Sequence, residues 1–199
     1  MNSSELYDIL HELPRVHEGV TDFKGWLPPG PMDAHGGTLA CRLGPIELLL
    51  AIQGGKEGET TLYVTAAVAD EVRVSDGLFR ELNELNANTL VVGRLFLHEF
   101  HNEDRTPNGF GVILLQEMIA CEHVDSGPSV NVPFQVIGRV GGMASRLALG
   151  LCSRHGGRPW PPESWMRIAM YADERYFDVV LQEVLVHYAT DTTDAGPSL

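Results

Sequence analysis

The segment HEFHNED, residues 98–104, holds the densest group of side chains in this chain that could do chemistry. His98 and His101 stand three positions apart, with the carboxylates of Glu99 and Asp104 beside them. Imidazole and carboxylate groups are the ligands that zinc and related divalent metals take in proteins. One hypothesis is therefore a metal- or small-ligand-binding domain, with or without enzymatic activity, that uses a hairpin tip bearing His98 and His101.

The spacing of these two histidines argues against a metal site. The segment ends an apolar run that predicts a strand, and residues three apart on a regular strand point to opposite faces. The helical zinc motif HExxH is excluded, because the second histidine comes one residue too early to share a helical face. The sequence offers no clear third ligand. We therefore interpret the segment as a polar hairpin tip before the turn RTPNG, and we predict no metal and no cofactor.

Other reactive side chains occur singly. His35 lies in DAHGG and His155 in RHGGRPWPP, both Gly- or Pro-rich stretches that predict surface loops, where a histidine is solvated. The glycines of GRVGGMAS follow neither the dinucleotide-binding nor the P-loop spacing, and no lysine is present there to bind phosphate. The nucleophile motif GxSxG is absent. We expect no catalytic residue, and hence a protein that is not an enzyme.

The composition limits which partners the protein can bind and in which cellular compartment we expect it. The formal net charge of the 199 residues is −13. This charge argues against nucleic acid, because binding phosphates takes clustered Lys and Arg. Cys41, Cys121 and Cys152 are scattered in apolar surroundings, which favours buried reduced thiols. The N-terminus has no basic, apolar signal sequence, and no run approaches the roughly 18 apolar residues of a membrane span. We expect a cytoplasmic protein that does not bind membranes.

Apolar periodicity predicts the elements that must position these side chains. Strands are expected at residues 38–43, 46–53, 61–69, 90–99 and 109–123, and helices at residues 3–13, 76–89, 132–151 and 173–189. The second helix should be capped by Ser75 or Asp76 and should end at an asparagine, since Asn tolerates the left-handed conformation. The third helix contains Gly141 and Gly142, which favour a kink there or a division into two pieces.

The order helix, three strands, helix, two strands, helix resembles the type III secretion chaperone fold, and more closely its YbjN-like relatives. The most specific parts of the resemblance are LNELNANTLVVGRLFL and the later strand GVILLQEMI. The resemblance covers residues 3–151. It implies an α+β fold with an antiparallel five-stranded sheet and flanking helices. It also implies a small acidic protomer that forms a homodimer and binds an extended segment of a client protein without doing chemistry on it.

The expected domain organisation follows from these elements. Residues 1–155 form the chaperone-like α+β domain, and residues 156–190 form a helical C-terminal extension after the break HGGRPWPPES. Residues 191–199 form a polar tail.

The strand patterns also predict apolar residues on both faces of the sheet. A second apolar face is covered by the chain's own extension, by a second protomer or by a client. These three alternatives stay open at the level of sequence. We expect a non-enzymatic chaperone or adaptor that binds a protein or peptide, and as the contact or interface residues we select Val92, Phe96, Leu114 and Met118.

Overall fold

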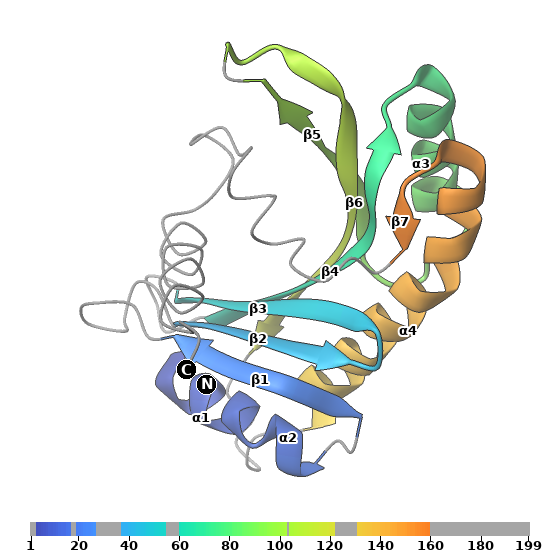
Figure 1. Ribbon diagram of the computed structural model, residues 1–199. Helices are drawn as coiled ribbons and strands as arrows, with labels where there is room; N and C mark the ends of the chain where they lie inside the picture. Colours follow the sequence, from blue (N-terminus) through green and yellow to red (C-terminus); the bar gives the residue numbers. More distant parts are fainter. Residues whose placement is uncertain are drawn as a thin grey trace, which may run out of the picture.

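One curved antiparallel sheet organises the computed structural model, which describes residues 3–16, 19–26, 37–54, 60–102, 104–121 and 131–159 (Figure 1). Within these residues the fold is α+β, with seven strands in the sheet. In chain order the elements are α1 (Ser3–His11), α2 (Leu13–Val16), β1 (Val20–Trp26), β2 (Gly37–Leu43), β3 (Ile46–Gly54), β4 (Thr60–Arg73), α3 (Asp76–Asn88), β5 (Arg94–His101), β6 (Pro107–Cys121), α4 (Asn131–His155) and β7 (Arg158–Pro159).

The strands pair in the order β1-β2-β3-β4-β6-β5, and β7 pairs separately with β4. The five strands predicted from the sequence are β2 to β6, and they follow one another and the helices α3 and α4 in the predicted sequence, but α2 and β1 come between the first helix and β2. The sheet is larger than predicted, because β1 and β7 join it. Strand β1 escaped prediction because a bulge after Thr21, with Asp22 at φ 49°, breaks the alternation of apolar and polar residues. Strand β7 is too short to carry a pattern.

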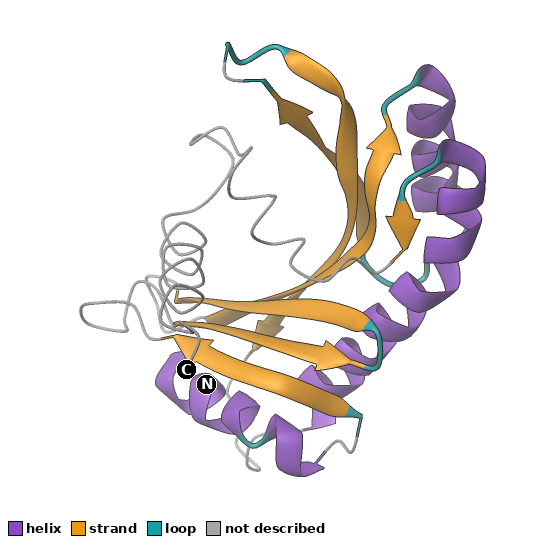
Figure 2. Ribbon diagram, in the orientation of Figure 1, coloured by secondary structure: helices purple, strands orange, loops and turns teal. Residues whose placement is uncertain are grey.

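All the longer helices pack on one face of the sheet (Figure 2). Helix α4 runs along the convex side against β3, β4 and β6, while α1 contacts β3 and α3 contacts β5. The alternate side chains of the strands meet these helices in one buried apolar cluster. Its members include Leu6, Leu10, Leu48, Leu50, Leu62, Val64, Leu78, Leu82, Leu115, Val136 and Val140. None of the described helices is long and apolar enough to cross a membrane.

The first predicted helix, residues 3–13, ends as α1 at His11, and a separate short helix, α2, begins at Leu13. Pro14 is the reason, since it has no N–H to donate back along the helix and is tolerated only in a first helical turn. Helix α4, in contrast, is one continuous helix through Gly141 and Gly142, and is not divided there. A side chain at Gly141 would place its Cβ 2.7 Å from Leu43 of β2. The glycine therefore serves close packing of α4 on the sheet.

Helix α3 begins as predicted and ends differently. Ser75 is the N-cap, and its Oγ accepts a hydrogen bond from the Leu78 N–H at 3.2 Å. At the other end Thr89 is the C-cap with φ −120°, and the described residues include no asparagine with positive φ. The prediction of a left-handed Asn was wrong. The left-handed residue that turns the chain into β5 is Gly93, with φ 65°.

The predicted helix at residues 173–189 and the tail at 191–199 lie outside the described residues. So does the predicted extension beyond residue 159.

Candidate functional site

The face of the sheet that points away from the helices has its own set of apolar side chains, which we call the second face. Strand register places Phe96 of β5 opposite Leu114 of β6, and Leu114 opposite Ala67 of β4. Tyr63 of β4 lies opposite Met118 of β6. Side chains directly opposite on an antiparallel pair point to the same face. Within the described chain, α1, α3 and α4 all contact the other face.

Part of the second face is buried. Six apolar side chains are almost inaccessible to water and yet stand apart from the main core cluster. Alternation along the strands places them on the second face, and we call them the buried band: Ala40, Leu49, Ala67, Phe100, Val112 and Leu114. The band crosses β2, β3, β4, β6 and β5.

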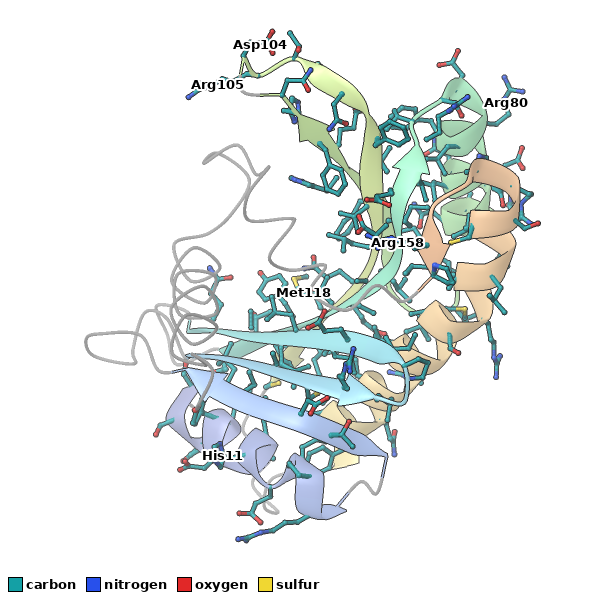
Figure 3. All side chains as sticks on the ribbon, viewed as in Figure 1. His11, Arg80, Asp104, Arg105, Met118 and Arg158 are labelled. Carbon is teal, nitrogen blue, oxygen red and sulfur yellow. The ribbon has the colours of Figure 1, made fainter. Side chains whose placement is uncertain are left out.

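Another part of the second face is open to solvent. Met118 is 63% exposed and Phe96 is 38% exposed. Figure 3 shows Met118 on the side of the sheet away from α4. Tyr63 is half-buried beside Met118, and its hydroxyl donates a hydrogen bond to Gln53 Oε1 at 2.9 Å. We call Tyr63, Phe96 and Met118 the open patch.

A polar row separates Phe96 from Met118 within this patch. Arg94 lies opposite Gln116, and the side chain of Gln116 donates a hydrogen bond to Thr65 Oγ1 at 2.9 Å. The patch therefore offers two apolar contacts with a hydrogen-bonding row between them, a pattern that suits the alternating side chains of an extended peptide.

The four residues selected from the sequence do not share one environment. Phe96 and Met118 are exposed on the second face, and Leu114 is buried on it at 6% exposure. Val92 is also 6% exposed, but it belongs to the main core cluster under the helices. Strand β5 begins only at Arg94, after the left-handed Gly93, so the alternation that pointed Val92 to the second face does not extend back to it.

The histidine segment forms the end of the β5–β6 hairpin. Its turn is held by Asn102 N–H donating to the Thr106 carbonyl at 2.8 Å, and by Asp104, whose Oδ1 accepts from the Thr106 hydroxyl and N–H. These hydrogen bonds, led by the one from the Thr106 hydroxyl, lower the pKa of Asp104. Burial, helped by the nearby charge of His101, lowers the pKa of His98.

The described residues contain no group of three or more His, Cys, Asp or Glu that could hold a metal ion, and Glu103 lies outside them. His98 instead packs edge-on against Phe100, with ring centroids 6.4 Å apart.

A charged cluster that the sequence did not reveal joins α3 to the end of α4. The guanidinium of Arg154 donates from Nε to both oxygens of Glu81, at 2.9 and 3.0 Å, and its Nη2 also donates to Glu81 Oε1. His155 Nε2 lies 2.8 Å from Glu81 Oε2. The hydrogen bonds from Arg154 are the main reason that the pKa of Glu81 is lowered. A carboxylate whose charge is balanced in this way is a poor base. The cluster therefore suits a structural role, in which it holds α3 to the end of α4.

The three cysteines are free thiols, as expected. Cys41 and Cys121 are buried, while Cys152 is half-buried. Burial, with a smaller contribution from the charge of Glu47, raises the pKa of Cys41 to about 12. Burial also raises the pKa of Cys121 and of Cys152. Raised pKa values keep these groups protonated, so none is an activated nucleophile near neutral pH.

Comparisons with known proteins found no relative from which a function could be inferred. No family model matches the chain, and neither a curated protein nor a solved structure matches it.

Proposed function

We propose that this chain is a non-enzymatic chaperone or adaptor that binds a protein or peptide segment on the open patch. The observation that carries the proposal is the exposure of Met118 and Phe96 on a sheet face that none of the described helices contacts. The elements from α1 to α4 support it, since they include, in sequence, the helix, three strands, helix, two strands and helix on which the resemblance to type III secretion chaperones and YbjN-like proteins rests, with α2 and β1 in addition. From the same resemblance we propose a homodimer, and from the composition of the sequence we propose a cytoplasmic location.

Binding would be driven by burial of apolar area. Each Å² of apolar surface removed from water contributes about 25 cal/mol to the free energy of binding. Burial of the side chains of Met118 and Phe96 by a client would therefore stabilise the complex. The net charge of −13 adds a long-range attraction for segments with basic residues. This attraction acts mainly on the association rate and weakens as salt is added.

The edge of β5 offers a second type of contact. Strand β5 pairs with β6 on one side and with no described strand on the other. Asn86 of α3 takes up the outward-facing N–H and carbonyl of Leu95. Because outward groups alternate along a strand, those of Leu97 and Glu99 also face outward. A client segment would add there as a further strand, with Phe96 and Met118 specifying its side chains.

Matched variants test the open patch. We expect Met118→Asp and Phe96→Asp to reduce capture of partners by the tagged protein at least about tenfold, because a charge would be buried in the contact. The matched controls are Leu149→Asp, at a residue 58% exposed on α4, and Phe79→Asp, at a residue 41% exposed on α3. Both controls should capture partners like the wild type, and circular dichroism should show all four variants folded.

The pattern across the four variants decides the outcome. Loss of partners in Leu149→Asp and Phe79→Asp as well would point to a general effect of surface charge. Full retention in folded Met118→Asp and Phe96→Asp would disprove the proposed contact. The oligomeric state, measured by light scattering for the same proteins, separates a client contact from a dimer interface.

A further inference from the structure

The buried band needs a cover that none of the described helices supplies. Leu49 is 2% exposed, Ala67 is 1% exposed and Leu114 is 6% exposed. Side chains in the middle of an uncovered sheet face stay in contact with water, as Met118 does on the same face. The described helices lie on the opposite face. A further layer of apolar side chains must therefore close this part of the second face.

The chain leaves the described structure next to the buried band. Helix α4 ends at His155, and the left-handed Gly156 and Gly157 reverse the chain into β7. Strand β7 pairs with β4 along the edge that β3 leaves free beyond Ala66, and it places Pro159 opposite Ala69. Ala67 of the buried band precedes Ala69 by two residues on β4. Forty residues, 160–199, follow this point.

The sequence of those residues suits an apolar surface. Phe177, Val180, Leu181, Val184 and Tyr188 recur at the spacing of one helical face between residues 173 and 189. A helix of that length spans about 25 Å at about 1.5 Å per residue. Five paired strands about 4.8 Å apart are about 19 Å wide, so one helix can cross the whole band. The thirteen residues 160–172 reach about 40 Å when extended, which is ample for this connection.

We propose that residues 173–189 dock as an amphipathic helix on the buried band of their own chain. The short connection raises the effective concentration of the segment at this surface to the millimolar range, which favours it over a separate partner. Docking on the band leaves the open patch beside it accessible.

Thiol labelling of the full chain tests the docking. The reporter is Thr65→Cys, which replaces one small side chain by another at a second-face residue that is 6% exposed, opposite Leu49 and hydrogen-bonded to Gln116. Met118→Cys in the open patch gives the reference rate for an exposed thiol. Cys41, buried in the main core, reports global unfolding in the same sample. Labelled positions are read from peptide masses.

We expect the Thr65→Cys thiol to react at least about tenfold more slowly than the Met118→Cys thiol, since labelling requires local opening. Adding Val184→Asp on the apolar stripe should bring the two rates together. Gln182→Asp adds the same charge off the stripe and should leave the Thr65→Cys rate unchanged. Cys41 should stay unreactive in every variant.

Equal rates for the Thr65→Cys and Met118→Cys thiols in the full chain would overturn the proposal. The proposal would also be overturned if protection of the Thr65→Cys thiol depended on protein concentration and did not change in Val184→Asp. That result would identify a second copy of the chain as the cover. If Cys41 also becomes reactive in Val184→Asp, that variant has unfolded and cannot test the docking. A photo-crosslinking residue at position 180 of the otherwise unchanged chain then tests it instead. Links to β3, β4 or β6 of the same chain support docking, and links only to another chain, or none, refute it. Because none of these measurements uses a client, they remain valid if the proposed function fails.

Discussion

The side-chain amide of Asn86 pairs with the backbone of Leu95 through two hydrogen bonds, each 2.8 Å long. Its Nδ2 donates to the Leu95 carbonyl, and its Oδ1 accepts from the Leu95 N–H. The amide thus makes the contacts that a peptide group of a neighbouring strand would make. It fixes α3 to the start of β5 and satisfies two polar groups at the edge of the sheet.

Replacement of Asn86 should therefore destabilise the protein. Asn86→Ala leaves the N–H and carbonyl of Leu95, a residue that is only 3% exposed, without this partner, and we expect a loss of about 1–3 kcal/mol in the free energy of unfolding. Urea denaturation measures the loss. Asn83→Ala, at an exposed position on the same helix, is the control and should change stability by less than about 0.5 kcal/mol. Equal stability of the two variants would show that the amide pair contributes nothing.

The outward direction of the Glu99 N–H predicts unequal effects of proline along β5. Glu99→Pro removes an N–H that faces away from β6 and should leave a folded protein, because proline is tolerated on the outer side of an edge strand. His98→Pro removes an inward N–H of the β5–β6 pairing and should lower the unfolding midpoint clearly. Thermal denaturation of both variants checks the direction. If a client adds as a strand, Glu99→Pro should also weaken its binding.

The Glu81–Arg154 pair predicts an acid-sensitive contribution to stability. The pKa of Glu81 is lower in the folded protein than in the unfolded chain, where a glutamate titrates at about 4.3. The pair therefore stabilises the fold above that value, and the contribution is lost as the pH falls through the folded pKa of Glu81.

Glu81→Gln should accordingly reduce stability at pH 7 and make less difference at pH 3. Urea denaturation at the two pH values measures the change. Glu84→Gln, at an exposed residue of the same helix, should show little effect at either pH. A deficit of Glu81→Gln that is as large at pH 3 as at pH 7 would mean that the loss is one of packing and not of charge.

Gly157 should tolerate a side chain less well than its neighbour Gly156. Both residues have positive φ, so alanine costs about 1–2 kcal/mol of backbone strain at either position. At Gly157 the added Cβ would also clash with the Asp70 carbonyl oxygen, whereas at Gly156 nothing lies within 4 Å of it. We expect Gly157→Ala to be the more destabilising by calorimetry, and to loosen β7 from β4. Equal losses would show that β7 can shift without cost.

Local patterns in the sequence were sufficient to place most elements. The strands β2 to β6 and the helices α1, α3 and α4 follow from apolar spacing, because periods of two and 3.6 residues are set by backbone geometry alone. Ser75 could be named as a cap for the same reason, since its hydrogen bond spans only three residues.

Contacts between distant parts of the chain decided the rest. Glu81 and Arg154 are 73 residues apart, and no spacing rule connects them. The asparagines near the end of α3 were expected to stop the helix, but one of them, Asn86, instead bonds to Leu95, because α3 lies against the edge of the sheet. Leu114 and Met118 have the same residue class, strand and face, yet one is buried and the other is exposed. Alternation fixes the face of a side chain, but its burial depends on what packs over each part of that face, and only tertiary structure determines that.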